Sequence, residues 1–248
     1  YMLLDTGQGI GLEFNARTLG VDLSTIKTLV FSHGHYDHTG GLPALLPFSQ
    51  KTRVIAHPDI FGQKYAANPA GSASDYSFAG MPLTKADLKA DPNCMLELSS
   101  GFRQISSGIY FSGQVPRRTG FEHPDTRLKI RQGAAYSDDP LTDDSSLLIE
   151  TRKGPVILTG CAHSGIINTL NHFKDQTGHE TFYAVIGGTH LGFLNAPDQL
   201  DKTMDAFDSF KLQMIAVSHC TGNEAAAALS NRFKDRFVFA NAGWTLTL

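Results

Sequence analysis

The sequence predicts a mixed α/β domain, because strand-length apolar runs alternate with stretches of helical periodicity along the chain. The chain has 248 residues, of which 41% are hydrophobic, and this length suits one domain with a sizeable core. The expected strands end in small or polar residues and cover 1–4, 26–31, 53–56, 108–111, 146–150, 156–158, 181–186, 214–217 and 237–240.

Three later stretches favour helices, because apolar residues return at spacings of three and four over 164–173, 198–210 and 223–233. The region from about 61 to 91 differs, since it is rich in Ala, Gly, Ser and Pro and has little periodicity. We interpret it as an insertion or lid on the single domain, not as a second core.

Charge and cysteine content narrow the class of protein. A net charge of -3 and a pI of about 6.4 argue against nucleic acid or an anionic membrane as partner, and favour a small molecule. No apolar run reaches the roughly 18 residues that a membrane-spanning helix needs. Three cysteines do not form a secreted disulfide framework, so we expect the cytoplasm. The first residue is Tyr1, so a truncated N-terminus and a removed leader stay open.

Four candidate metal ligands follow the apolar run 26–31, namely His33, His35, Asp37 and His38. Two imidazoles two residues apart on a short turn can address one point, and Gly34 leaves room for the bend. The next carboxylate and imidazole can address a second point. Such ligands suit zinc, iron or manganese. The alternative is that these histidines only cap the turn or face solvent. That alternative would suffice for a single histidine, but it explains a cluster of three poorly.

This segment resembles the His-x-His-x-Asp-His signature of metallo-β-lactamase-fold hydrolases. Residues 5–7 resemble the family's early Asp-containing strand end, and 217–219 resemble the late strand that ends in a ligand His, here His219. The resemblance extends from residue 3 to about 222. It implies an αββα sandwich of two facing mixed sheets flanked by helices, with a centre of one or two ions, zinc first and iron or manganese as alternatives.

The sequence departs from the family pattern after the strand at 156–158. The usual Gly-His-Thr-Pro-Gly-like stretch is absent, and Cys161 stands where the family has a metal-bridging Asp. A thiolate is a competent zinc ligand, but a small buried hydrophobe is an equal alternative for Cys161. His163 can replace the missing imidazole, against the alternative of a histidine at a helix entry. Cys220 is interpreted as packing.

The departures resemble one branch, the dihydropteroate-synthase-related members that include ribofuranosylaminobenzene-phosphate synthases. The segments that carry this likeness are 32–42, 160–168, 187–191 and 219–222. His190 binds metal or substrate on this interpretation. Arg117 and Arg118 either grip an anionic substrate or form a solvated basic turn. Asp143 and Asp144 either orient a ligand His or start a strand.

We therefore expect a hydrolase in which metal-bound hydroxide attacks an ester, phosphoester or related bond of a small, anionic and pterin-related substrate. Asp37 orients the water or takes its proton. The expected ligands are His33, His35 and His163 on one side and Asp37, His38 and His219 on the other.

Two rival hypotheses stay open. One is a non-catalytic metal-binding or partner-binding protein on the same fold, which a closed four-ligand shell would favour. The other is redox chemistry at a di-iron centre. Antibiotic hydrolysis is disfavoured, because zinc β-lactamases usually carry Arg where His38 stands. The sequence does not predict the oligomeric state.

Overall fold

The computed structural model describes residues 1–48, 51–193 and 198–248, which divide into two units by their internal contacts. We describe each unit by itself. The expectation of one domain stays a prediction. The first unit comprises Tyr1–Ser100 and Thr126–Asp143, and the second comprises Gly101–Asp125 and Asp144–Leu248.

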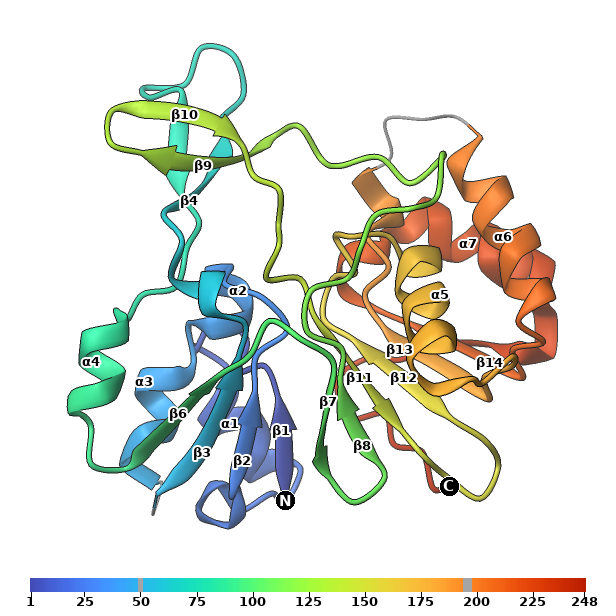
Figure 1. The fold of residues 1–248 in the computed structure, drawn as a ribbon, viewed down its shortest axis with the longest axis horizontal. Coiled ribbons are helices and arrows are strands. Elements are labelled where there is room, and N and C mark those ends of the chain that lie inside the picture. The colour runs from blue at the N-terminus through green and yellow to red at the C-terminus, as the bar shows by residue number, and fades with distance from the viewer. Residues whose placement is uncertain (49–50, 194–197) are drawn as a thin grey trace. The chain divides into compact units, whose positions relative to one another are not determined.

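Unit 1 contains a four-stranded parallel sheet with the strand order β1-β2-β3-β6 (Figure 1). Its strands are β1 (Met2–Leu4), β2 (Thr28–Val30), β3 (Thr52–Ala56) and β6 (Cys94–Leu98). Its helices are α1 (Leu12–Thr18), α2 (Tyr36–Thr39), α3 (Leu42–Leu45) and α4 (Lys85–Ala90). Leu29, Phe31 and Val54 lie in a common apolar core with Leu42 and Leu45. Successive residues of β2 and β3, such as Leu29 with Val30 and Val54 with Ile55, are buried, which explains why these two strands read as continuous apolar runs.

A second, antiparallel sheet of unit 1 has the order β10-β9-β4-β5. Its strands are β4 (Lys64–Ala67), β5 (Tyr76–Phe78), β9 (Leu128–Gln132) and β10 (Ala135–Asp138). The region 61–91 is therefore more regular than its sequence indicated. Its strand β4 pairs with β9, which is distant in the sequence, and a local pattern cannot reveal such a partner. The lid role stays a prediction.

Unit 2 contains a seven-stranded mixed sheet in the order β15-β14-β13-β12-β11-β8-β7 (Figure 1). Its strands are β7 (Arg103–Ser106), β8 (Ile109–Phe111), β11 (Ser146–Ile149), β12 (Val156–Thr159), β13 (Ala184–Gly187), β14 (Met214–Val217) and β15 (Phe237–Phe239). Because β12, β13 and β14 are parallel, the segments that follow them begin at one edge of the sheet.

Three helices of unit 2 supply side chains to its apolar core: α5 (Ile166–Thr177), α6 (Gln199–Ser209) and α7 (Asn223–Phe233). These are the three helices that the periodicity predicted. Short 3₁₀ turns complete the two units, at η1 (Leu23–Thr25), η2 (Leu46–Phe48), η3 (Pro58–Phe61), η4 (Leu191–Phe193), η5 (His219–Thr221) and η6 (Lys234–Arg236).

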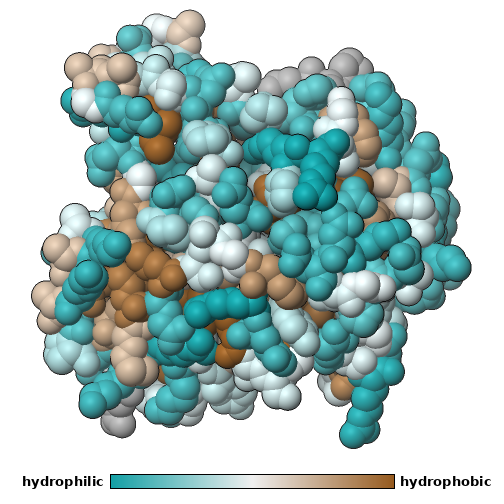
Figure 2. All heavy atoms as spheres, in the orientation of Figure 1, coloured by the Kyte–Doolittle hydropathy of each residue, from teal (hydrophilic) through white to brown (hydrophobic). Residues whose placement is uncertain are grey.

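The surface is mostly hydrophilic on the face that Figure 2 shows, with an apolar area near α3 and α4. A hollow of unit 1 in that region is lined by Pro43, Leu46, Leu83 and Leu88, among others. Within the described residues, no helix combines the length and the apolar character needed to cross a membrane.

Candidate metal centre

The histidine motif of unit 1 begins directly after β2, in a turn that only glycine fits. The backbone N–H of Gly34 donates to Oδ2 of Asp143 at 2.7 Å. A Cβ atom at Gly34 would lie 2.2 Å from the carbonyl oxygen of Ile60, which is backbone and cannot swing aside. From the sequence we expected Gly34 to leave room for the bend, and the close approach of the Ile60 carbonyl oxygen supplies the physical reason.

The turn brings one ring nitrogen of His33 close to one ring nitrogen of His35. Nε2 of His33 lies 2.9 Å from Nδ1 of His35, and both side chains are buried. Two nitrogens that share one ion lie about 3 Å apart when each bond is about 2.0–2.1 Å long. Burial, reinforced by Lys64, lowers the pKa of His35 to about 3. His35 is therefore neutral near pH 7, which is the form that binds metal.

His38 is held by a carboxylate at its far nitrogen. Its Nδ1 lies 2.7 Å from Oδ2 of Asp5, and Asp5 also accepts hydrogen bonds from the backbone N–H and hydroxyl of Ser32 at 2.8 and 2.7 Å. This arrangement directs Nε2 of His38 outward, where it lies 3.6 Å from Oδ2 of Asp37. A histidine that is fixed by a carboxylate at one nitrogen is typical of metal ligands.

A buried lysine pairs with the carboxylate that anchors this turn. Nζ of Lys64 lies 2.9 Å from Oδ2 of Asp139 and 2.8 Å from Oδ1 of Asp143, with all three side chains almost fully buried. Burial opposes the charge of Lys64, but the two carboxylates outweigh it and raise its pKa. Since Asp143 also binds Gly34, the chain of contacts runs from the lysine to the histidine turn.

In unit 2, three side chains of types that can bind a metal follow three neighbouring parallel strands: Cys161 after β12, His190 after β13 and Cys220 after β14. One ligand atom from each lies within 4.8 Å of the others. Nε2 of His190 lies 3.2 Å from Oδ2 of Asp125. Burial lowers the pKa of His190, but Asp125 and Cys220 together raise it to about 9.

The loop after β12 also carries His163, whose ring centroid lies 4.3 Å from that of His190. Asp144 supports this loop, because its Oδ2 accepts the backbone N–H of Ser164 at 2.8 Å. Burial raises the pKa of Asp144 to about 6. Asp143 and Asp144 thus anchor backbone segments next to predicted ligands, each within its own unit.

The remaining predicted residues of unit 2 lie in varied surroundings. His219 follows β14 and is exposed, with a left-handed backbone at φ 55°. Nη1 of Arg118 pairs with Oδ2 of Asp175 at 2.8 Å on an exposed surface. Arg117 is partly buried. Burial raises the pKa of Glu122, and the positive charge of Arg117 is one of the influences that lower this pKa. Substrate binding by the two arginines stays a prediction.

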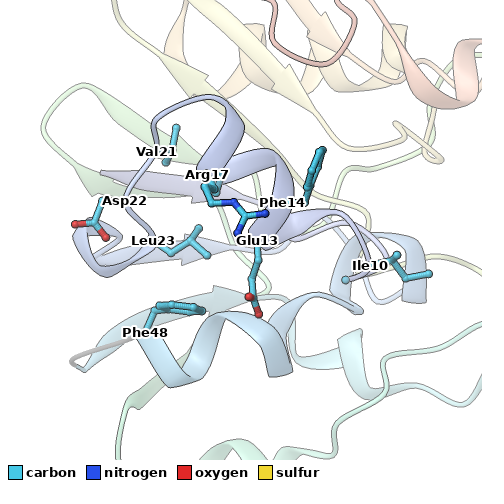
Figure 3. A pocket seen from close by; sticks show the side chains of 10 residues that line it. Ile10, Glu13, Phe14, Arg17, Val21, Asp22, Leu23 and Phe48 are labelled. Carbon is cyan, nitrogen blue, oxygen red and sulfur yellow. The ribbon is translucent and has the colours of Figure 1, made fainter.

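Two hollows lie within the separate units. Figure 3 shows one in unit 1, of ≈ 690 Å³, to which α1 contributes Glu13, Phe14 and Arg17. Its described lining contains no imidazole or thiol. The other, in unit 2, measures only ≈ 20 Å³ and borders His163 and His190.

Sequence reasoning missed Lys64, Asp125 and Asp139 as supporting residues. Lys64 is a single lysine in an irregular segment, and nothing local marks it as buried. Asp125 is a single aspartate outside the predicted strands and helices. A signal was present for Asp5, since its strand end had been matched to the family pattern.

Comparison with known proteins identifies the class. A family model described as the metallo-β-lactamase superfamily matches residues 1–219. The chain belongs to this superfamily. A crystal structure of a metal-dependent hydrolase of the β-lactamase superfamily matches with a TM-score of 0.83 and 27% identity, covering 100% of this chain and 88% of the other. The chain therefore has the metallo-β-lactamase fold.

Two curated relatives come from Methanocaldococcus jannaschii. One, named 7,8-dihydropterin-6-methyl-4-(beta-D-ribofuranosyl)-aminobenzene-5'-phosphate synthase, is 30% identical over 239 residues, or 93% of this chain and 78% of its own length. The other, an uncharacterised protein, is 33% identical over 244 residues, or 98% and 86%. A diphosphatase of the PhnP family shares the fold, with a TM-score of 0.52 at 14% identity, over 99% of this chain and 78% of the other.

Proposed function

We propose that this protein is a metal-dependent hydrolase that cleaves an ester or phosphoester bond in a small anionic molecule. The observation that carries the proposal is the buried histidine turn of unit 1, with Nε2 of His33 at 2.9 Å from Nδ1 of His35. Superfamily membership supports an enzyme that works with a divalent metal.

The proposed ligands of unit 1 are His33, His35, Asp37 and His38. Their donor set of imidazole and carboxylate suits zinc, iron or manganese. His163 and His219 are proposed as further ligands on their position in the sequence alone. A divalent ion held by such ligands lowers the pKa of water towards neutrality and polarises the bond under attack.

The chain's own residues have distinct tasks in this proposal. Asp5 keeps His38 in one orientation through the 2.7 Å contact with Nδ1. Asp37 is the proposed proton acceptor, because it is only partly buried and its carboxylate lies beside His38. Neutral His35 contributes a lone pair without first losing a proton.

The substrate class rests on one relative and on two arginines. The relative from M. jannaschii is named for a product that carries a pterin and a phosphate ester. Arg117 and Arg118 are proposed to recognise an anionic group, since guanidinium groups bind phosphate and carboxylate with two hydrogen bonds. A pterin-related phosphoester is thus the first substrate class to assay.

The test combines metal analysis with turnover. Protein purified without chelator should contain about two equivalents of zinc, iron or manganese, as a dinuclear hydrolase requires. The metal content should fall in His33→Ala and His163→Ala. His179→Ala is the matched control, because His179 is a partly exposed histidine paired with Glu150. It should keep the full metal content.

The reaction is then followed on nitrophenyl esters, nitrophenyl phosphates and pterin phosphoesters with each reconstituted metal. Because Asp37 is also a proposed ligand, Asp37→Asn is assayed with enough added metal to restore its metal content, and it should then still lack turnover. Near-normal turnover in Asp37→Asn would show that Asp37 has another role. Little metal in the wild type, even after reconstitution, would remove the hydrolase proposal and favour a non-catalytic binding protein on the same fold.

A further inference from the structure

Unit 2 contains a cluster of two thiols and an imidazole that the proposed hydrolase centre does not use in full. Cys161, His190 and Cys220 follow three adjacent parallel strands, and one ligand atom from each lies within 4.8 Å of the others. All three are members of unit 2. Sequence analysis treated Cys220 as packing and Cys161 as either a ligand or a small buried hydrophobe.

The backbone is shaped so that the two thiols can approach each other. A Cβ atom at Gly188 would lie 2.7 Å from Sγ of Cys220 and 2.3 Å from the carbonyl oxygen of Gly160. Sγ of Cys220 lies 3.5 Å from the carbonyl oxygen of Cys161 and donates a hydrogen bond to it. Glycine at position 188 is therefore required for Cys220 to reach the loop that carries Cys161.

His190 is held in the manner of a metal ligand. Its Nε2 hydrogen-bonds Oδ2 of Asp125 at 3.2 Å, and Asp125 is buried. Its Nδ1 is buried, and no described residue makes a hydrogen bond of good geometry to it. A carboxylate at one ring nitrogen and an ion at the other is the usual arrangement around a metal-bound histidine.

His190 also adopts a backbone conformation that is uncommon for a residue with a side chain. Its φ is 54°, and Ala162 beside Cys161 has φ 55°. Left-handed backbone is unfavourable at a non-glycine residue and concentrates at functional sites. The strain in these two loops is consistent with side chains that are positioned for binding.

We propose that Cys161, His190 and Cys220 form a second, thiolate-rich metal site that binds zinc or a similar thiophilic divalent ion, with Asp125 orienting His190. In tetrahedral zinc sites, ligand atoms lie about 3.5–3.8 Å apart for bonds of about 2.3 Å to sulfur and 2.0–2.1 Å to nitrogen. The cluster therefore needs to contract by about 1 Å at most.

A small cavity adjoins His190 and Asp125. This cavity of ≈ 20 Å³ also borders Ala162, and its volume holds about one water molecule. Binding releases to solvent the protons that the two cysteines and the imidazole of His190 carry, and it forms two metal–sulfur bonds and one metal–nitrogen bond, so no oxidant or reductant is involved. Thiolates select softer ions than the imidazole and carboxylate groups of the histidine motif do.

The test uses Co²⁺ as a spectroscopic probe on the full chain, with a non-thiol reductant present. Sulfur-to-cobalt charge transfer gives a near-ultraviolet band only when thiolate binds the ion. The wild type should show this band, and Zn²⁺ should displace it. Cys161→Ser and Cys220→Ser should each weaken the band strongly, and Asp125→Asn should weaken Co²⁺ affinity by about 10–100-fold.

Two controls separate this site from its surroundings and from the proposed function. Cys94→Ser removes the third cysteine, which lies in unit 1, and should leave the band unchanged. His35→Ala disables the histidine centre and should also leave the band in place, since His35 shares no candidate metal-binding group with a cysteine among the described residues. Loss of hydrolysis with retention of the band, or the reverse, thus distinguishes failure of one proposal from failure of the other.

Two results would overturn the thiolate site. One is a wild-type protein that binds Co²⁺ without the charge-transfer band while its circular dichroism is native. The other is a disulfide between Cys161 and Cys220 in reduced, zinc-treated protein. As a second measurement, Zn²⁺ should slow the alkylation of these two thiols, and it should leave the alkylation rate of Cys94 unchanged.

Discussion

Oδ2 of Asp5 lies 2.7 Å from Nδ1 of His38, so a residue at the end of β1 determines which nitrogen of a histidine in α2 faces outward. The same carboxylate accepts the backbone N–H and hydroxyl of Ser32 at the end of β2. Asp5 adopts φ 58°, a left-handed conformation that asparagine and aspartate tolerate better than most residues. The ends of β1 and β2 together thereby fix the orientation of His38, which is a proposed ligand.

Asp5→Asn should weaken metal binding by about 10–100-fold, because the amide cannot hold the His38 ring as a carboxylate does. Competition titration with a chromophoric chelator measures this change. Asp22→Asn is the control, since Asp22 only caps an exposed 3₁₀ turn of the same unit. An unchanged dissociation constant in Asp5→Asn would show that His38 does not depend on Asp5.

Gly34→Ala should destabilise the fold by about 1–3 kcal/mol and reduce metal content, because its Cβ would lie 2.2 Å from the Ile60 carbonyl oxygen. Urea unfolding, followed by circular dichroism, measures the free energy. Gly101→Ala should be nearly neutral, since nothing lies within 4 Å of a Cβ there. Equal stability of the two variants would contradict the packing argument.

Lys64→Met should cost about 3–5 kcal/mol, since it leaves Asp139 and Asp143 buried without their counter-ion. Lys129→Met breaks the more exposed pair with Asp138 and should cost about 0–1 kcal/mol. Thermal and urea unfolding of both variants check the difference. A small loss in Lys64→Met would indicate that the two carboxyl groups take up a shared proton.

The stability of the metal-free protein should fall as the pH drops from about 6.5 towards 3. His35 has a folded pKa of about 3 and an ordinary value of 6.5, so in this window the unfolded chain binds a proton that the folded chain does not. His35→Gln should flatten the dependence, whereas the control His179→Gln should not. Urea midpoints at several pH values measure it, and identical slopes in wild type and His35→Gln would refute the assignment.

Local patterns in the sequence predicted those strands that consist of a continuous run of apolar residues and those helices that bury one apolar face. The strands β2, β3 and β12 and the helix α7 are examples, since each has its own apolar signature. The histidine motif was found for a similar reason: its candidate ligands stand within six residues of one another, directly after a strand.

Contacts between distant residues were not predictable from local patterns. The pairing of β4 with β9, the burial of Lys64 between Asp139 and Asp143, and the approach of Cys220 to Cys161 each join segments far apart in the sequence. No local pattern specifies such partners. Asp143 shows the difference well, since its role is fixed by Gly34, which lies 109 residues earlier.

The hydrogen bond between Gly34 and Asp143 joins two segments that the ribosome synthesises at different times. The histidine turn is synthesised early, but the carboxylate that receives its backbone N–H is added 109 residues later. Chains are synthesised at about 5–20 residues per second, so this delay lasts on the order of 5–20 seconds. During that interval the turn lacks its final anchor, so a metal ion that bound then would meet proposed ligands whose backbone support is incomplete.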